Sequence, residues 1–268
     1  MRGVKRVSNW TLIFSRRLIF VGFLGVVFAG LPSHADMMAS GSSLPPREAL
    51  ENPELYFRLD SPVVREISQE ELLRINPLFR KKDIVDFGQC DQTRIQESGV
   101  NPLDELNVLV DQIINIGKKI WNIVSAGKPV ANFKTDVAYA LPKGVDCWTQ
   151  LSNWSVPAAK NYQVTYRNKF GVEVIQFTYQ LTYTYGGKVG DVGAYITNAT
   201  ILPAHINVAW GFSFDATAEV PSVFNVGSFG EPVGAMQINV MWKVENVLTH
   251  EQKTNSYFVN GLGDFKQL

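Results

Sequence analysis

The feature that most constrains the fold is a two-residue alternation of apolar and polar side chains through the second half of the chain. In the clearest run, every second residue is large and apolar: Ile175, Phe177, Tyr179, Leu181, Tyr183 and Tyr185. Such a period places one face of a strand in an apolar layer and the other face in water. Similar runs recur up to Val244, and glycines and prolines separate them.

No helix-length pattern lies between these runs, which excludes parallel βαβ units. The sequence therefore predicts a mainly β domain over residues 128–268. We expect an antiparallel two-sheet β-sandwich, similar to a jelly roll, with about eight strands. The same alternation also describes a small outer-membrane β-barrel, whose apolar faces point at lipid. That alternative is less favoured because the chain ends in Phe265-Lys266-Gln267-Leu268, without a terminal aromatic residue.

A second pattern, with a period of three to four residues, covers residues 101–127. Asn101 can cap a helix, Pro102 suits its first position, and Gly127 suits its end. The apolar residues between them follow helical spacing: Leu106, Leu109, Val110, Ile113, Ile116, Ile120, Trp121 and Val124. The sequence predicts one amphipathic α-helix here, packed against the sheet.

The first 35 residues have the organisation of a secretory signal peptide. They carry five basic residues and no acidic residue, and Leu18–Leu31 is an uncharged apolar run. Pro32 breaks this run, and small residues then lead to an expected cleavage between Ala35 and Asp36. The sequence thus predicts export to the periplasm, the cell surface or the medium. Residues 36–100 read as an extended N-terminal arm containing a short helix from Ser68 to Ile75.

The chain has two cysteines, Cys90 and Cys147. In an oxidising compartment they can form a disulfide that ties the arm to the β domain. Removal of the predicted signal peptide leaves 20 basic and 25 acidic residues, a net charge of −5. Nucleic-acid binding needs clustered Lys and Arg, so this balance argues against it.

The sequence contains no motif for phosphate binding, for a nucleophilic serine or for a zinc site. His205 and His250 have no neighbouring acidic or cysteine cluster, so we expect neither a metal nor a cofactor. A secreted hydrolase remains an alternative, because two carboxylates from different strands, such as Asp191 and Glu231, can share a cleft.

A binding site does not need the catalytic motifs that are missing from this sequence. Trp148 and Trp154 flank an irregular polar segment and are the tryptophans most suited to stack on a sugar ring. Two glycine-rich loops, 186–193 and 227–234, carry Asp191 and Glu231 and can approach a ligand closely. We expect an exported, non-enzymatic binding or structural protein of the cell envelope. Its sandwich loops would recognise a glycan, an envelope component or a partner protein. The chain resembles sugar-binding and adhesin-like sandwiches in architecture alone.

Overall fold

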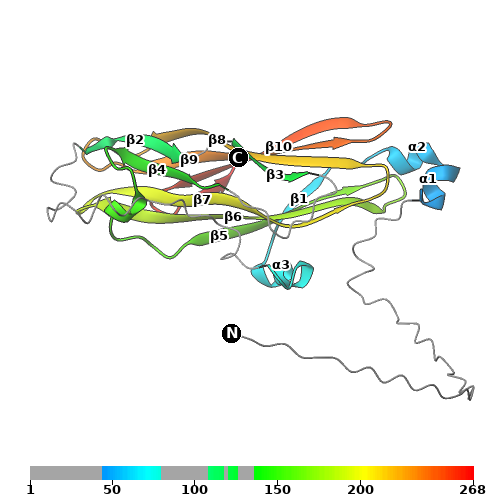
Figure 1. Ribbon diagram of the computed structural model, residues 1–268, viewed down its shortest axis with the longest axis horizontal. Helices are drawn as coiled ribbons and strands as arrows, with labels where there is room; N and C mark the ends of the chain where they lie inside the picture. Colours follow the sequence, from blue (N-terminus) through cyan, green and yellow to red (C-terminus); the bar gives the residue numbers. More distant parts are fainter. Residues whose placement is uncertain (1–43, 80–107, 118–119, 126–135) are drawn as a thin grey trace, which may run out of the picture. The chain divides into compact units, whose positions relative to one another are not determined.

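The computed structural model describes residues 44–79, 108–117, 120–125 and 136–268, which form two antiparallel sheets and three short α-helices (Figure 1). These elements belong to one compact unit, Gly41–Leu268. The first sheet has six strands in the spatial order β1 (Val63–Ile67), β5 (Ala158–Arg167), β6 (Glu173–Val189), β7 (Val192–Val208), β4 (Ala138–Lys143) and β2 (Leu109–Gly117).

The second sheet has five strands in the order β11 (Phe265–Gln267), β10 (His250–Asn260), β9 (Gly234–Glu245), β8 (Ser213–Asn225) and β3 (Ile120–Ser125). β11 pairs only with Tyr257–Val259, at one end of β10. Among the described strands, the two sheets form separate layers and neither closes into a barrel.

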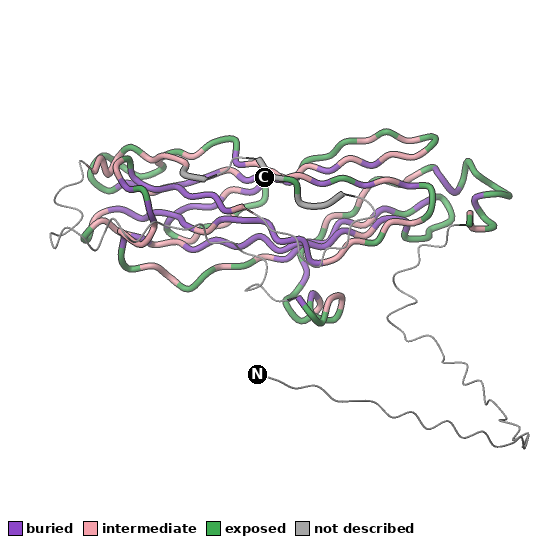
Figure 2. The backbone as a smooth tube through the Cα atoms, viewed as in Figure 1, coloured by how far each residue is buried: buried purple, intermediate pink, exposed green. Residues whose placement is uncertain are grey.

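The predicted alternation determines which side chains lie between the layers. Tyr179 and Leu181 of β6 are fully buried, as are Val240 and Val244 of β9. Burial is nearly continuous along the middle of β6 and β7, whereas buried and partly exposed residues alternate along β8 and β9 (Figure 2). The prediction of a mainly β domain with two antiparallel sheets is confirmed.

The six-stranded sheet is also partly covered on its outer side. There α3 (Gln69–Ile75) places Leu72 against a second apolar cluster that includes Ile67 of β1 and Leu202 of β7. The Ser68 hydroxyl accepts a hydrogen bond from the Glu71 N–H at 3.0 Å, which caps the helix. This helix begins and ends where the sequence predicts.

The predicted helix over 101–127 is wrong wherever the structure describes this range. β2 pairs with β4 in the first sheet, and β3 pairs with β8 in the second. The segment is rich in β-branched side chains such as Ile113 and Ile114, which favour a strand. It also contains Gly117, which costs stability in a helix interior. Strand pairing with distant partners therefore overrode a helical spacing of apolar residues.

The N-terminal arm predicted over 36–100 is also only partly extended. Its described part forms α1 (Arg47–Glu51), α2 (Pro53–Phe57), β1 and α3. β1 joins the first sheet through antiparallel pairing with β5. The predicted signal peptide and Cys90 lie outside the described residues, so cleavage at Ala35 and the Cys90–Cys147 disulfide remain predictions.

Candidate functional site

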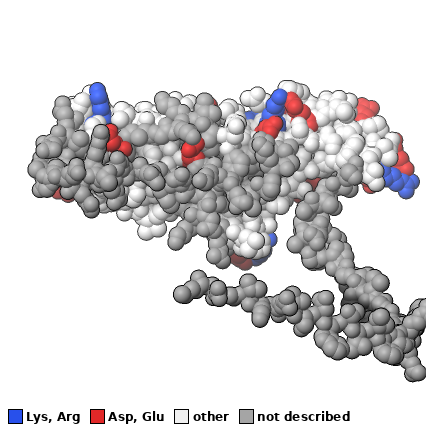
Figure 3. All heavy atoms as spheres, in the orientation of Figure 1, with Lys and Arg blue, Asp and Glu red and all other residues white. Residues whose placement is uncertain are grey.

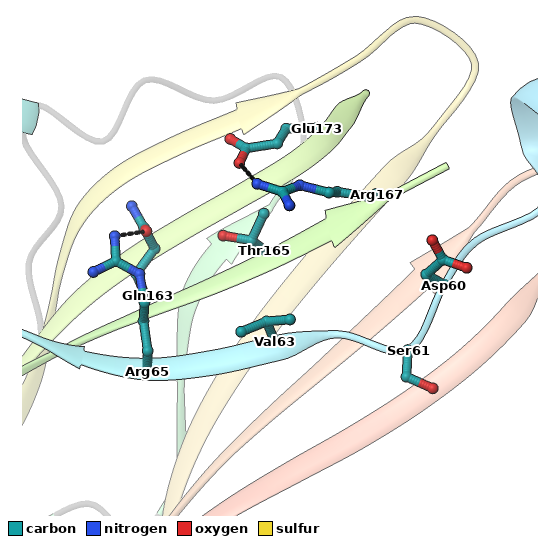
Figure 4. Close-up of a pocket in the computed structure, with 8 residues that line it drawn as sticks. All are labelled: Asp60, Ser61, Val63, Arg65, Gln163, Thr165, Arg167 and Glu173. Carbon is teal, nitrogen blue, oxygen red and sulfur yellow. Dashed lines mark hydrogen bonds and ion pairs between the residues drawn. The ribbon is translucent and has the colours of Figure 1, made fainter. Parts of the chain in front are cut away.

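An open groove of about 440 Å³ lies on the outer side of the six-stranded sheet, between β1 and the start of β6 (Figure 4). Alternation turns the side chains of alternate residues in β1 and β5 to this side, and the strand register brings Arg65 opposite Gln163. The groove is lined by Asp60, Ser61, Val63, Arg65, Gln163, Thr165, Arg167 and Glu173. It combines amide, hydroxyl, guanidinium and carboxylate groups with one apolar side chain.

Arg65 is held in place from two sides. Its guanidinium donates to the Gln163 amide oxygen and to the Glu71 carboxylate, with an Nη1–Oε2 distance of 3.1 Å. These contacts join β1, β5 and α3 at one point. The hydrogen bond that Arg65 donates to Glu71 raises the pKa of Arg65, and the same bond lowers the pKa of Glu71. Arg65 therefore stays charged and oriented along the groove.

The charges of the groove are balanced. Arg167 donates to Glu173 at 2.7 Å, and Asp60 forms an ion pair with Lys169. The lining itself carries two cations and two anions, so it favours neither a strongly anionic nor a strongly cationic ligand. Figure 3 shows the same mixture on the face in view, where acidic and basic side chains lie close together.

Trp148 and Trp154 lie together, but they pack on the domain. Both are partly buried against the second apolar cluster. The Trp154 indole N–H donates to the Trp148 carbonyl at 3.1 Å. The indole ring also covers Gly187, where an added Cβ would lie 2.2 Å from the ring. These contacts give both tryptophans a structural role and leave less of each ring for a ligand.

The two glycine-rich loops predicted to carry ligand contacts do come together. The Ala194 N–H donates to the Pro232 carbonyl at 2.9 Å, and Ala194 forms a bridge with Val233. Asp191 is exposed at the tip of the first turn, and Glu231 is exposed beside the tip of the second, where it pairs with Ser228. Gly187 and Gly227 are explained by close packing, because a Cβ at Gly227 would lie 2.2 Å from the Glu231 carbonyl oxygen.

Sequence reasoning missed the groove residues because their proximity depends on pairing between distant segments. Arg65 and Gln163 are 98 residues apart in the chain. The sequence signal for this site is the polar face of β5, where Gln163, Thr165 and Arg167 alternate with the apolar core residues Tyr162, Val164 and Tyr166. The sequence does not show that β1 pairs with β5, and it is this pairing that makes the polar face of β5 part of a groove.

The described residues contain no group of three His, Cys, Asp or Glu side chains placed to hold a metal ion. His205 lies on β7, where burial lowers its pKa. None of the helices that the structure describes is long and apolar enough to cross a membrane. The chain matches no protein-family model and no curated protein, and it has no match among solved structures.

Proposed function

We propose that this chain is an exported, non-enzymatic binding protein of the cell envelope, and that the groove between β1 and β6 holds a neutral glycan. The observation that carries the proposal is the fixed position of Arg65 between Glu71 and Gln163. A site built on restrained side chains loses little conformational entropy when a ligand binds.

The chemistry of the lining supports a sugar as the ligand. A sugar hydroxyl both donates and accepts hydrogen bonds, and it is best met where donors and acceptors lie side by side. Arg65 with Gln163 and Arg167 with Glu173 provide two such pairs (Figure 4). Val63 is 60% exposed and offers an apolar contact for the C–H face of a ring.

The arrangement of the two carboxylates in the groove supports binding over hydrolysis. Asp60 and Glu173 are the two acids that line the groove, and they come from different segments, as the two acids of a glycosidase can. Each forms an ion pair, Asp60 with Lys169 and Glu173 with Arg167. Both carboxylates are thus engaged as partners of basic residues that shape the groove.

A glycan array followed by calorimetry tests this proposal on protein recovered from the exported fraction. Arg65→Ala should lower the affinity for a bound glycan by about tenfold or more, as loss of an interface anchor does. Arg74→Ala is the matched control, because Arg74 forms an exposed ion pair with Glu70 on α3 and does not line the groove. Two outcomes would contradict the proposal: an array on which the protein binds no glycan, or an Arg65→Ala variant that binds a glycan as tightly as the wild type.

Two further measurements separate the alternatives. Release of reducing ends from a bound glycan would identify a hydrolase, and Glu173→Gln would then abolish turnover. An exported protein whose measured mass corresponds to a chain that starts at Asp36 would support the proposed signal peptide. A retained segment 1–35 would contradict it.

A further inference from the structure

One end of the domain carries a group of exposed large apolar side chains. It is formed by α1, α2 and the turns that join β5 to β6, β7 to β8 and β9 to β10 (Figure 1). Its members, called here the apolar end surface, are Leu50, Leu55, Phe170, Trp210, Val247 and Leu248. Val247 is 76% exposed and Leu50 is 67% exposed. Contiguous exposed apolar surface of this kind marks an interaction site more often than a free surface.

The members are held together by α2. The Leu55 carbonyl accepts from the Lys169 N–H at 3.2 Å, which fixes the β5–β6 turn. The Tyr56 hydroxyl donates to the Trp210 carbonyl at 3.0 Å, which fixes the β7–β8 turn. The Asn246 amide donates to the carbonyl of Phe57 at 2.9 Å, which fixes the β9–β10 turn. The surface is therefore one built feature, although four separate segments contribute to it.

A groove of about 420 Å³ crosses this surface between α2 and the β9–β10 turn. Pro53, Phe57, Val247 and Leu248 form its apolar walls. The ion pair between Glu54 and Arg58 lies beside it. An apolar centre beside paired charges has the anatomy of a protein–protein interface.

We propose that the apolar end surface binds the same surface of a second copy of this chain, giving a two-fold symmetric dimer. A two-fold interface uses the same patch on both copies, and this patch offers both an exposed apolar side chain, Leu50, and a groove with apolar walls. The segments that build it, 47–57, 168–172, 209–212 and 246–249, contain 24 residues, which lies within the roughly 20–30 residues a side of a standard interface.

The charges around the surface favour a second copy over a lipid bilayer. The surface and its margin carry three basic residues and four acidic ones, and three ion pairs join them: Arg47–Glu51, Arg58–Glu54 and Lys169–Asp60, with Glu48 as the fourth acidic residue. Figure 3 shows acidic and basic side chains side by side at this end. Two such near-neutral surfaces repel each other little, whereas an anionic membrane attracts basic clusters.

Sedimentation equilibrium on the exported protein tests the proposal. The wild type should form a dimer, and Val247→Glu with Leu248→Glu should raise the dimer dissociation constant by about tenfold or more. The β9–β10 turn does not depend on these side chains, because Asn246 Oδ1 accepts from the N–H groups of Leu248 and Thr249. Leu50→Glu on α1 tests the surface independently, should the double variant fail to fold.

The matched control is Phe229→Glu. Phe229 is 90% exposed, but it lies in the turn between β8 and β9, away from the apolar end surface. This variant should dimerise like the wild type. A protein that stays monomeric up to about 100 μM would overturn the proposal. Unchanged dimerisation of both folded surface variants would also overturn it. Flotation of a monomer with phosphatidylcholine vesicles would assign the surface to lipid instead.

Discussion

The hydroxyl groups of Tyr179 and Tyr257 lie 2.7 Å apart in the interior, one from each sheet. Tyr179 comes from β6 and Tyr257 from β10, and both side chains are fully buried. The Asn255 amide also donates to the Tyr257 hydroxyl at 3.1 Å. This polar contact joins the two layers, as does the hydrogen bond from the Trp242 indole N–H of β9 to the Tyr166 hydroxyl of β5 at 2.9 Å.

Tyr257→Phe should lower the free energy of unfolding by about 1–3 kcal/mol, because it leaves the buried Tyr179 hydroxyl without this partner. Urea unfolding followed by circular dichroism measures the change. The control is Tyr185→Phe, since Tyr185 is only partly buried and packs its ring on Tyr183. Equal losses in the two variants would contradict a special role for the hydroxyl pair.

The buried tyrosines should make the protein sensitive to alkali. Burial raises the pKa of Tyr166, Tyr179 and Tyr183 to about 12, from the ordinary value of 10.0. Their contribution to stability is complete below pH 10. Above pH 10 the unfolded chain releases phenolic protons that the folded chain retains, so stability falls as pH rises from 10 to 12.

Urea unfolding at pH 9, 10, 11 and 12 measures this loss, which amounts to at most about 1.4 kcal/mol per pH unit for each tyrosine. Phenolate absorbance identifies the group that titrates. Tyr183→Phe should show a shallower decline. Full ionisation of these side chains in the folded protein at pH 10 would show that they are more accessible than the structure indicates.

Trp154 and Gly187 should behave as a coupled pair. Gly187→Ala alone places a methyl group against the indole and should cost about 1–3 kcal/mol of stability. Trp154→Ala should cost about 2–4 kcal/mol through lost packing and the lost hydrogen bond to Trp148. In the double variant the added methyl group meets no ring, so the combined cost should be well below the sum. Additive costs would show that the ring does not lie on Gly187.

The cover formed by α3 rests on Leu72, which is fully buried, whereas its neighbour Leu73 is exposed. Leu72→Ala should cost about 2–5 kcal/mol, and Leu73→Ala should cost less than about 1 kcal/mol. The first variant should also weaken ligand binding in the groove, because α3 carries the Glu71 carboxylate that holds Arg65. Thermal unfolding and calorimetry measure the two effects separately.

The proposed Cys90–Cys147 disulfide predicts that the unfolded, unreduced protein has no titratable thiol and the reduced protein has two. Reduction should lower the free energy of unfolding by about 4 kcal/mol through the entropy of the open loop. The variant with both cysteines replaced by serine should match the reduced protein and should not respond to reductant. Two thiols in the unreduced protein would disprove the pairing.

The strands of the two sheets were predictable because successive side chains of a strand point to opposite faces, so a two-residue period of apolar residues indicates a strand by itself. In β6 the apolar residues from Ile175 to Tyr183 lie in the core, as the alternation predicts. The prediction that the other face lies in water is wrong here, because Thr178, Gln180 and Thr182 are buried as well. Helix α3 was predictable for a similar local reason, since its cap at Ser68 lies within three residues of its partner.

The errors have a shared physical cause, which is dependence on distant partners. Ile113 and Ile120 fit a helix by spacing, but the pairing of β2 with β4 and of β3 with β8 decides their conformation. Trp148 and Trp154 look free in an irregular segment, yet they fill space beside a turn that follows them by about thirty residues. The groove depends on Arg65 meeting β5, which no local pattern specifies.

The short pairing of β11 has a further consequence for how chains can associate. It leaves the residues of β10 from His250 to Asn255 without a described neighbour on that side, and this stretch carries the ion pair between Glu251 and Lys253. Charged side chains on such an exposed margin discourage another chain from adding a strand there. Open-ended growth by strand addition along this stretch of β10 is therefore disfavoured, and contacts made there would have to use side chains rather than backbone.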